Sequence, residues 1–355
     1  MQYDTAIVGA GLAGLHLAHL LGSRGLRVVL IDRRPSIATP IHTTGIFVRR
    51  TWEDFPLPEE QLGPPIRDVI LHSPALRRLT LRSAADEFRI ARMEWLYLAL
   101  LERCSRAGVA WIPGAAFLSW QPGELAFVRR GLRIRCAARF VVGADGARSA
   151  VAAQLGLDRN REFLAGVEQV VACSAPPALH CFLDPQLAPG YIGWIAADGR
   201  TAHIGLAGYP SRFDPSSALA EFRARVAHIA DGAVLERRGG LIPVNGILRR
   251  IANGSGLLVG DAAGAVSPLT AGGFDAALRL SAFAADVVTG FLDRGDPAVL
   301  RTYDGARLRS QTFVRRCLRR AMRVPWPSAL IEAGFDMLEP LARRVFFGRG
   351  LSLAA

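Results

Sequence analysis

One stretch near the start of the chain decides the fold, Thr5-Ala6-Ile7-Val8-Gly9-Ala10-Gly11-Leu12-Ala13-Gly14. A short apolar run, which predicts a buried strand over residues 3–8, ends there in a G-x-G-x-x-G turn, and apolar residues then recur at helical spacing as far as Leu21. The first glycine permits a tight turn, the second lets the backbone approach a pyrophosphate, and the third lets helix and strand pack closely. The unpaired amides of the helix N-terminus then face the phosphates. The residues expected to contact a dinucleotide at this turn are Gly9, Gly11, Leu12, Ala13 and Gly14.

A second apolar strand, residues 27–31, ends in an acid at the position that binds a ribose. Asp32 lies 18 positions after Gly14, close to the ~20 that separate this acid from the turn in dinucleotide-binding units. Asp32 favours a free 2′-hydroxyl over a 2′-phosphate, but the motif alone does not separate NAD from FAD. The next two residues, Arg33 and Arg34, either contact the cofactor or are solvated charges, and Arg33 is the one that we select as a candidate contact.

Composition excludes several kinds of chemistry. The 355 residues include 43 basic ones against 31 acids, a formal charge of +12, and every basic residue is an arginine. Without lysine there is no Schiff-base catalysis and no phosphate loop of the GxxxxGK[ST] type. We see no nucleic-acid recognition module, so we expect no nucleic-acid partner.

The location of the protein is also predicted from the sequence. The longest charge-free apolar stretches, residues 107–120 and 262–274, are shorter than the ~18–20 residues that cross a bilayer, and no secretory signal is visible at the N-terminus. The five cysteines are scattered and odd in number, which favours reduced thiols. We therefore expect a cytoplasmic protein, with peripheral contact to the inner face of the membrane as a further possibility.

Two more strands end in small residues where a ligand can approach the backbone. The strand at residues 140–142 runs into Gly143-Ala144-Asp145-Gly146-Ala147-Arg148-Ser149, and the strand at 256–259 runs into Gly260-Asp261-Ala262-Ala263-Gly264. Pro268 and the run Ala271-Gly272-Gly273-Phe274 follow, before an apolar helix as far as Phe291. A carboxylate at such a strand end can accept hydrogen bonds from a polyhydroxyl chain.

These three motifs, in this order, resemble the FAD-dependent oxidoreductases of the p-hydroxybenzoate hydroxylase fold. The resemblance spans residues 1 to about 300 and implies FAD as cofactor. It places Asp261 on the ribityl chain and gives Asp145 both structural and cofactor-linked roles. Arg92, just before the apolar helix 95–101, matches the family arginine that reaches the phosphate and ribityl region; otherwise it is an ordinary arginine at a helix start. The predicted FAD contacts beyond the glycine turn are Asp32, Arg33, Arg92, Asp145, Asp261, Pro268, Gly272, Gly273 and Phe274.

The motifs predict an α/β fold with a discontinuous Rossmann-like FAD-binding domain. We assign residues 1–40, 82–165 and 244–300 to that domain. Residues 41–81 and 166–243 are expected to form an antiparallel substrate-binding sheet over the flavin. A hairpin around Asp198-Gly199-Arg200 is part of this expectation, because a D-G turn between two short apolar runs is a strong hairpin signal. Residues 301–355 are expected to form basic amphipathic helices.

Within this fold the local sequence is most similar to the geranylgeranyl reductase branch, in Gly260–Gly264 and in Tyr191-Ile192-Gly193-Trp194. That resemblance implies reduction of prenyl-chain double bonds by reduced flavin, supplied with electrons by NAD(P)H or a reduced ferredoxin-like donor. The branch commonly carries a P-C-G-G-like segment, but this chain has Pro40-Ile41-His42-Thr43-Thr44-Gly45 instead. Two alternatives therefore stay open: a monooxygenase that hydroxylates an aromatic or polyketide-like substrate, and a non-catalytic flavin-binding or electron-transfer protein.

Substrate contacts and proton donors are less well defined. The expected partner is a hydrophobic small molecule or lipid, and the residues proposed to line its space are His42, Thr44, Tyr191 and Trp194. His42, His180 and His203 are possible proton donors, although a lone histidine or strand aromatic is more often structural. No residue is assigned as catalytic, and no metal site is expected.

Much of the positive charge lies near the C-terminus. The span 301–323 has eight arginines and one acid, Asp304, a local +7 of the total +12. On a helix, Phe313, Val314, Cys317, Leu318, Ala321 and Met322 occupy one half-circle, and Arg315, Arg316, Arg319, Arg320 and Arg323 occupy the other. Such a helix either lies in an anionic membrane surface or packs its apolar face on the flavin domain with the arginines in solvent.

Overall fold

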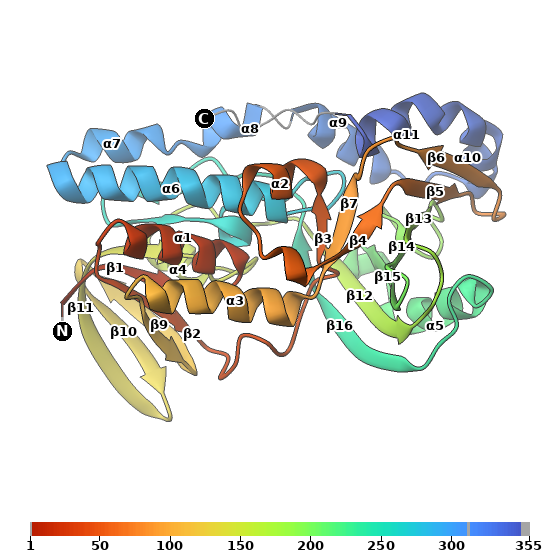
Figure 1. The fold of residues 1–355 in the computed structure, drawn as a ribbon. Helices are drawn as coiled ribbons and strands as arrows, with labels where there is room; N and C mark the ends of the chain where they lie inside the picture. Colours follow the sequence, from red (N-terminus) through yellow and green to blue (C-terminus); the bar gives the residue numbers. More distant parts are fainter. Residues whose placement is uncertain (1, 311–312, 349–355) are drawn as a thin grey trace.

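The computed structural model describes residues 2–310 and 313–348, and it has two lobes joined along one side by C-terminal helices (Figure 1). The first lobe is built on an eight-stranded sheet with the order β17-β18-β11-β1-β2-β8, to which β10 and β9 are added beside β11. Its strands are β1 (Gln2–Val8), β2 (Val28–Asp32), β8 (Ala110–Pro113), β9 (Ala115–Gln121), β10 (Gly123–Arg129), β11 (Leu132–Gly143), β17 (Ala252–Asn253) and β18 (Gly256–Leu258).

The central strands of this sheet are parallel, so their carboxyl ends meet at one edge. β1 pairs in parallel with both β2 and β11, and β11 pairs in parallel with β18. The helices α1 (Leu12–Ser23), α3 (Met93–Arg106) and α6 (Phe274–Arg294) pack beside one another over the sheet (Figure 1). All three sequence motifs therefore end at the same edge, as expected for a dinucleotide-binding sheet. The short helix α4 (Ala150–Gln154) follows β11.

The glycine turn holds α1 against β1 without room for side chains. Gly9 has φ +105°, and a Cβ on it would lie 2.3 Å from the carbonyl oxygen of Ala144. A Cβ on Gly14 would lie 1.9 Å from the carbonyl oxygen of Gly9. Gly11 differs, because nothing lies within 4 Å of the position of its Cβ. Two of the glycines thus serve packing, and the third leaves open space.

The second lobe contains a seven-stranded sheet with the order β16-β12-β15-β14-β13-β5-β6. The predicted hairpin is present, since β14 and β15 are antiparallel and Ala197 pairs with Ala202 across the turn. The sheet is antiparallel except between β13 and β5, which are parallel. Its elements are β5 (Asp68–His72), β6 (Arg78–Arg82), β12 (Phe163–Ala172), β13 (Ala178–Phe182), β14 (Gly193–Ala197), β15 (Thr201–Gly208), β16 (Val234–Pro243), η2 (Pro210–Arg212) and the packed helix α5 (Pro215–Val226).

The structure corrects one expectation for residues 41–81. Only β5 and β6 from this segment join the large sheet. β3 (Ile46–Val48) and β4 (Leu62–Ile66) instead pair with β7 (Phe88–Ala91) in a separate three-stranded sheet. β7 lies outside the predicted segment, so local sequence gave no indication of this pairing. The helix α2 (Arg49–Asp54) and the turn η1 (Glu59–Gln61) lie between β3 and β4.

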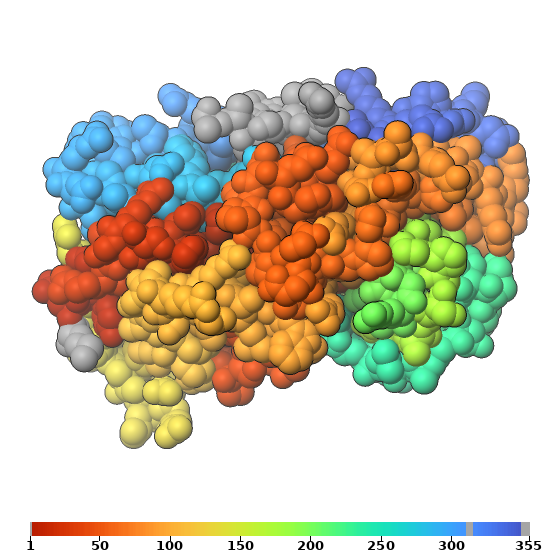
Figure 2. Space-filling view, in the orientation of Figure 1, coloured from red at the N-terminus to blue at the C-terminus, as the bar shows by residue number. Residues whose placement is uncertain are grey.

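The C-terminal helices run from the first lobe to the second (Figure 1). α11 packs on β6, and Phe335 is buried in the core of the second lobe; Figure 2 shows this segment against the strands of residues 62–91. No helix in the described ranges is long and apolar enough to cross a membrane. The elements are η3 (Gly260–Ala263), α7 (Pro297–Thr302), α8 (Gly305–Ser310), α9 (Phe313–Met322), α10 (Ser328–Gly334), η4 (Phe335–Leu338) and α11 (Glu339–Phe346).

The two kinds of glycine in the turn predict different effects of added methyl groups. Gly14→Ala should destabilise the flavin-free protein by about 1–3 kcal/mol, because the methyl group overlaps the Gly9 carbonyl and alanine's better helix propensity recovers only ~1 kcal/mol. Gly11→Ala is the matched control, and its stability should stay within about 1 kcal/mol of the native protein. Urea unfolding of both variants measures the difference, and equal stabilities would contradict this account of the packing.

Candidate functional site

A cavity of about 2070 Å³ runs from the glycine turn to the C-terminal helices. Its first part lies along the carboxyl edge of the parallel sheet, where Gly9, Gly11, Leu12 and Ala13 form part of the wall. Gly11 is the N-cap of α1, and no side chain caps that helix end. The first amides of α1 therefore face open space with positive electrostatic potential, which suits a pyrophosphate.

Asp32 lies at the end of β2, in the cavity wall, as predicted. Its Oδ2 accepts a hydrogen bond of 2.7 Å from the Ala10 amide, and Arg34 donates to the same carboxylate at 3.0 and 3.1 Å. Burial alone would raise the pKa of Asp32, but these hydrogen bonds hold it below the ordinary value. Arg33, the predicted cofactor contact, is exposed at the cavity wall. Arg34 is neither a free solvated charge nor open to a ligand at its carboxylate-bound face, because it pairs with Asp32.

Asp145 has a structural role in this structure. Its carboxylate accepts hydrogen bonds from the Ser149 hydroxyl at 2.6 Å and from the amides of Ala150 and Val151 at 2.7 and 3.1 Å. It thus satisfies amides at the start of α4. Asp145 also lines the cavity, and burial raises its pKa.

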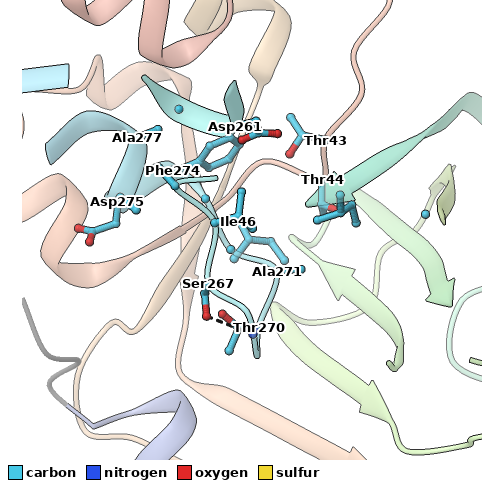
Figure 3. Close-up of a pocket in the computed structure, with 18 of the residues that line it drawn as sticks. Thr43, Thr44, Ile46, Asp261, Ser267, Thr270, Ala271, Phe274, Asp275 and Ala277 are labelled. Carbon is cyan, nitrogen blue, oxygen red and sulfur yellow. Dashed lines mark hydrogen bonds between the residues drawn. The ribbon is translucent and has the colours of Figure 1, made fainter. Parts of the chain in front are cut away.

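Asp261 lines the cavity without a partner. Among the described residues, none donates a hydrogen bond to its carboxylate or forms an ion pair with it. Burial raises its pKa to about 6, because the ionised form lacks compensating donors. Figure 3 shows Asp261 near Thr43, with Phe274 between Asp261 and Asp275. Donors for this carboxylate would have to come from a ligand, and ribityl hydroxyls are of the right kind.

The residues after Asp261 shape the next part of the cavity. Gly272 and Gly273 line it at the start of α6, and Phe274 stacks on Phe47 of β3 with ring centroids 4.6 Å apart. The glycines leave the amide end of α6 accessible to an electron-rich ring atom. The ring site that the sequence predicts at this stretch stays a prediction.

Two predicted contacts do not line this cavity. Arg92 is exposed, and its guanidinium donates to the Glu60 carbonyl at 2.7 Å, because η1 lies on that side of the start of α3. Pro268 is buried behind the wall between Ser267 and Leu269, which do line the cavity. A cofactor contact by Arg92 or Pro268 stays a prediction, which the lining of this cavity does not support.

The first half of the cavity fits FAD. The pyrophosphate of FAD lies between its adenosine ribose and its ribityl chain, and the cradle at Gly11, the acid at Asp32 and the unpartnered Asp261 all line this cavity. When bound, the flavin supplies two-electron redox chemistry.

The sheet side of the cavity carries a buried polar cluster around Glu168, a residue that sequence reasoning missed. Glu168 is only 4% exposed. It accepts hydrogen bonds from the Thr44 hydroxyl, from Trp194 Nε1 at 3.0 Å and from His203 Nδ1 at 3.1 Å, and Arg238 lies 3.6 Å away. Burial by itself raises the pKa of Glu168, but these donors lower it below the ordinary value. Glu168 is therefore an ionised acid that fixes its neighbours.

Sheet register brings this cluster together. Glu168 of β12 lies opposite Arg238 of β16 and Gly205 of β15. A Cβ on Gly205 would lie 2.3 Å from the Trp194 ring, so this glycine lets the indole cross β15 and reach Glu168. These contacts depend on pairings between distant segments, which explains why local sequence did not reveal Glu168 and Arg238.

The predicted substrate residues all line the cavity. Thr44 and Trp194 meet at Glu168, whereas the Tyr191 hydroxyl donates to the Thr270 carbonyl at 2.5 Å. His42 Nδ1 lies 3.1 Å from the Gly239 carbonyl oxygen. The other two histidines lie outside the cavity lining: His203 is buried against Glu168, and His180 Nδ1 lies 3.0 Å from His72 Nε2.

The far half of the cavity is apolar. One wall is formed by Leu179 and Cys181 of β13 and by Ile192, just before β14. The C-terminal helices form the other, through Leu318, Met322, Trp326, Leu338, Leu341, Ala342, Val345, Phe346 and Phe347. The cavity thus joins a polar dinucleotide site to an apolar chamber.

The raised pKa of Asp261 predicts a gain in stability on its removal. A carboxyl whose folded pKa exceeds its unfolded value of 3.8 lowers stability as pH rises from about 4 to about 6. Asp261→Asn should therefore stabilise the flavin-free protein at pH 7 by about 1–3 kcal/mol and change little at pH 4. The same variant should bind FAD at least ~10-fold more weakly. Urea unfolding measures the change in stability, and flavin titration measures the change in affinity. A variant that is less stable than the native protein at pH 7 would contradict the inference that the Asp261 carboxylate has no donor.

All four partners of Glu168 are donors, so an amide cannot replace the carboxylate. Glu168→Gln should cost about 3–5 kcal/mol at pH 7, because it leaves Arg238 without its buried partner. Since the pKa of Glu168 is lowered, this cost should shrink as the solution is acidified through the folded pKa. Glu236→Gln is the control: Glu236 pairs with the same arginine at 2.6 Å but is only half-buried, so its loss should cost under ~1 kcal/mol. Similar losses of stability in both variants would contradict the inference that Glu168 is the acid that holds this cluster together.

Known proteins share this sequence pattern and fold. Residues 7–50 match the family described as NAD(P)-binding Rossmann-like domain. The chain is 26% identical to a digeranylgeranylglycerophospholipid reductase of Methanocella arvoryzae, over 85% of this chain and 82% of that protein. It is also 26% identical to a geranylgeranyl diphosphate reductase of Rhodobacter capsulatus, over 90% and 83%.

Solved structures agree on the fold. A geranylgeranyl bacteriochlorophyll reductase-like protein of Thermoplasma acidophilum has a TM-score of 0.84 at 17% identity, over 99% of this chain and 94% of that one. A p-nitrophenol 4-monooxygenase of Pseudomonas putida has a TM-score of 0.73 at 16% identity, over 98% and 97%. The resemblance predicted from the motifs is therefore confirmed: the chain has the fold of these structures and is similar in sequence to geranylgeranyl reductases.

Proposed function

We propose that the protein is an FAD-dependent oxidoreductase that reduces double bonds in a prenyl chain. The observation that carries this proposal is the single cavity, in which a dinucleotide site opens into a chamber walled by aliphatic and aromatic side chains. A long hydrocarbon needs such a chamber, whereas a compact aromatic substrate is held by a closed pocket with a few convergent polar groups. The similarity to prenyl reductases supports the same function.

The chain's own residues position the substrate and exclude water. The sheet holds Trp194 and Thr44 at the cavity wall through Glu168, so a chain lying against them has a fixed orientation relative to the loop 271–274. The apolar wall keeps water from the reacting carbons. Thr43 and Thr44 stand where related reductases have a cysteine, and the Thr44 proton is already donated to Glu168. We assign Thr44 to positioning.

The electrons come from an external donor, for which we propose NAD(P)H or a reduced ferredoxin-like protein. A monooxygenase is the second candidate, supported by the shared fold with p-nitrophenol 4-monooxygenase. A flavin-binding protein without catalysis is the third. The three candidates differ in whether they convert the substrate and in whether they need oxygen to do so, and one experiment therefore separates them.

The test is anaerobic turnover of the flavin-loaded protein, reduced with dithionite and mixed with geranylgeranyl diphosphate. We expect flavin reoxidation and, by mass spectrometry, a product with two added hydrogens per reduced double bond. Flavin-free protein is the control. Product containing an added oxygen atom, formed only in air, would assign a monooxygenase instead. Flavin that stays reduced with every substrate would support the non-catalytic alternative.

We also propose that the C-terminal surface contacts an anionic membrane, from which a lipid substrate is drawn. Val324, Trp326, Leu330, Met337 and Leu341 expose large apolar side chains there. Arg320 of α9 and Arg344 of α11 are exposed in the same C-terminal region, without an ion pair among the described residues. Trp326 and Leu341 also line the cavity, so the apolar surface continues into the chamber. Arginines suit anionic headgroups.

Sedimentation with liposomes tests this contact. The protein should pellet with anionic liposomes and much less with neutral ones. Met337→Asp should weaken binding about tenfold, because burying a side chain of this size contributes ~1.5–3 kcal/mol; Met337 is 77% exposed. Leu132→Asp, at an equally exposed site on β11, is the control and should bind normally. Equal absence of the native protein from both pellets would refute membrane contact.

A further inference from the structure

The edge of the cavity between α2, α6 and α9 has more positive than negative charge. Four arginines line it, and three acids face them. The arginines are Arg49, Arg50, Arg279 and Arg315, and the acids are Glu53, Asp54 and Asp275.

Each of the three acids already has an arginine partner. Asp275 lies 2.5 Å from Arg50 and 3.0 Å from Arg279. Arg279 also pairs with Asp54, and Glu53 lies 3.6 Å from Arg49. These pairs leave one guanidinium in excess.

The excess guanidinium is that of Arg315. Among the residues that the structure describes, Arg315 has no hydrogen bond and no ion pair, although it is partly buried in the cavity wall. Burial and the nearby Arg50 lower its pKa, but arginine keeps its proton at neutral pH. Arg315 also lies in the first turn of α9, where the helix dipole adds positive potential. The acid whose charge reaches Arg315 is Asp275, and it is already paired with Arg50 and Arg279.

The same face of α9 continues as an apolar wall. Leu318 and Met322 follow Arg315 at the i+3 and i+7 positions, and both line the cavity. Leu341 and Val345 of α11 line it beyond them. A ligand along this wall would have its negative charge at Arg315 and its hydrocarbon chain toward α11.

We propose that Arg315, beside Arg50, forms a subsite for the phosphate or diphosphate end of the substrate, whose chain lies along Leu318 and Met322. This inference rests on the proposed function and deepens it. Guanidinium groups bind phosphate oxygens through paired, charge-assisted hydrogen bonds. The arrangement selects phosphorylated prenyl compounds over the corresponding alcohols.

Binding to the oxidised, flavin-loaded protein tests this subsite without turnover. Calorimetry would compare geranylgeranyl diphosphate with geranylgeraniol, which has the same chain and no phosphate. The native protein should prefer the diphosphate by at least ~10-fold. Arg315→Ala should remove that preference and leave the affinity for the alcohol unchanged. Arg316→Ala, which removes a charge of the same helix that does not line the cavity, should bind both compounds like the native protein.

Arg315→Lys distinguishes a loss of charge from a loss of helix packing. It keeps the positive charge, so it should retain part of the preference for the diphosphate over the alcohol. Equal weakening of both compounds by Arg315→Ala, or an unchanged preference, would overturn the subsite. So would weaker NADPH binding with the lipid preference intact, which would assign the arginine to the reductant. If the native protein binds neither prenyl compound, the proposed function fails and the subsite with it.

Discussion

The site depends on the close approach of three backbone segments at the glycine turn. The turn after β1, the start of α1 and the chain leaving β11 meet without intervening side chains, since a Cβ on Gly9 or Gly14 would overlap a carbonyl oxygen. This contact directs the amides of α1 into the cavity. It also brings Asp32, Asp145 and Asp261, from three different strand ends, to the same edge of the sheet.

These acids show that similar strand ends serve different purposes. Asp145 caps a helix, Asp32 is held by Arg34 and a backbone amide, and Asp261 has no donor among the described residues. Only the last of these environments disfavours the charged form strongly enough to raise the pKa to about 6. Burying an ionised carboxylate without donors destabilises the folded protein. Such an acid therefore indicates a place where a ligand supplies the missing hydrogen bonds.

Local motifs predicted what short-range geometry determines, and failed where distant segments meet. The glycine turn, the hairpin at Gly199 and the start of α6 followed from residues adjacent in sequence. Glu168 was missed because the register of β12 with β15 and β16 supplies its partners. The Arg92 side chain contacts the Glu60 carbonyl of η1, a partner that the residues next to it in the sequence do not indicate.

The arginines of α9 show the same limit. Helical periodicity placed them all on a solvent or membrane face, but Arg319 is only 2% exposed and lies over the Tyr209 ring at 4.9 Å, donating to the Gly190 carbonyl. Phe313 and Val314, on the expected apolar face, have side chains outside the described residues. Part of the positive charge of α9 therefore packs this helix against the second lobe or lines the cavity.

The most direct test is a crystal structure with FAD and a prenyl ligand. We predict that a double bond of the ligand lies beside Thr44 and Trp194, with the rest of the chain under α9 and α11. A ligand confined to the polar half of the cavity would contradict this prediction.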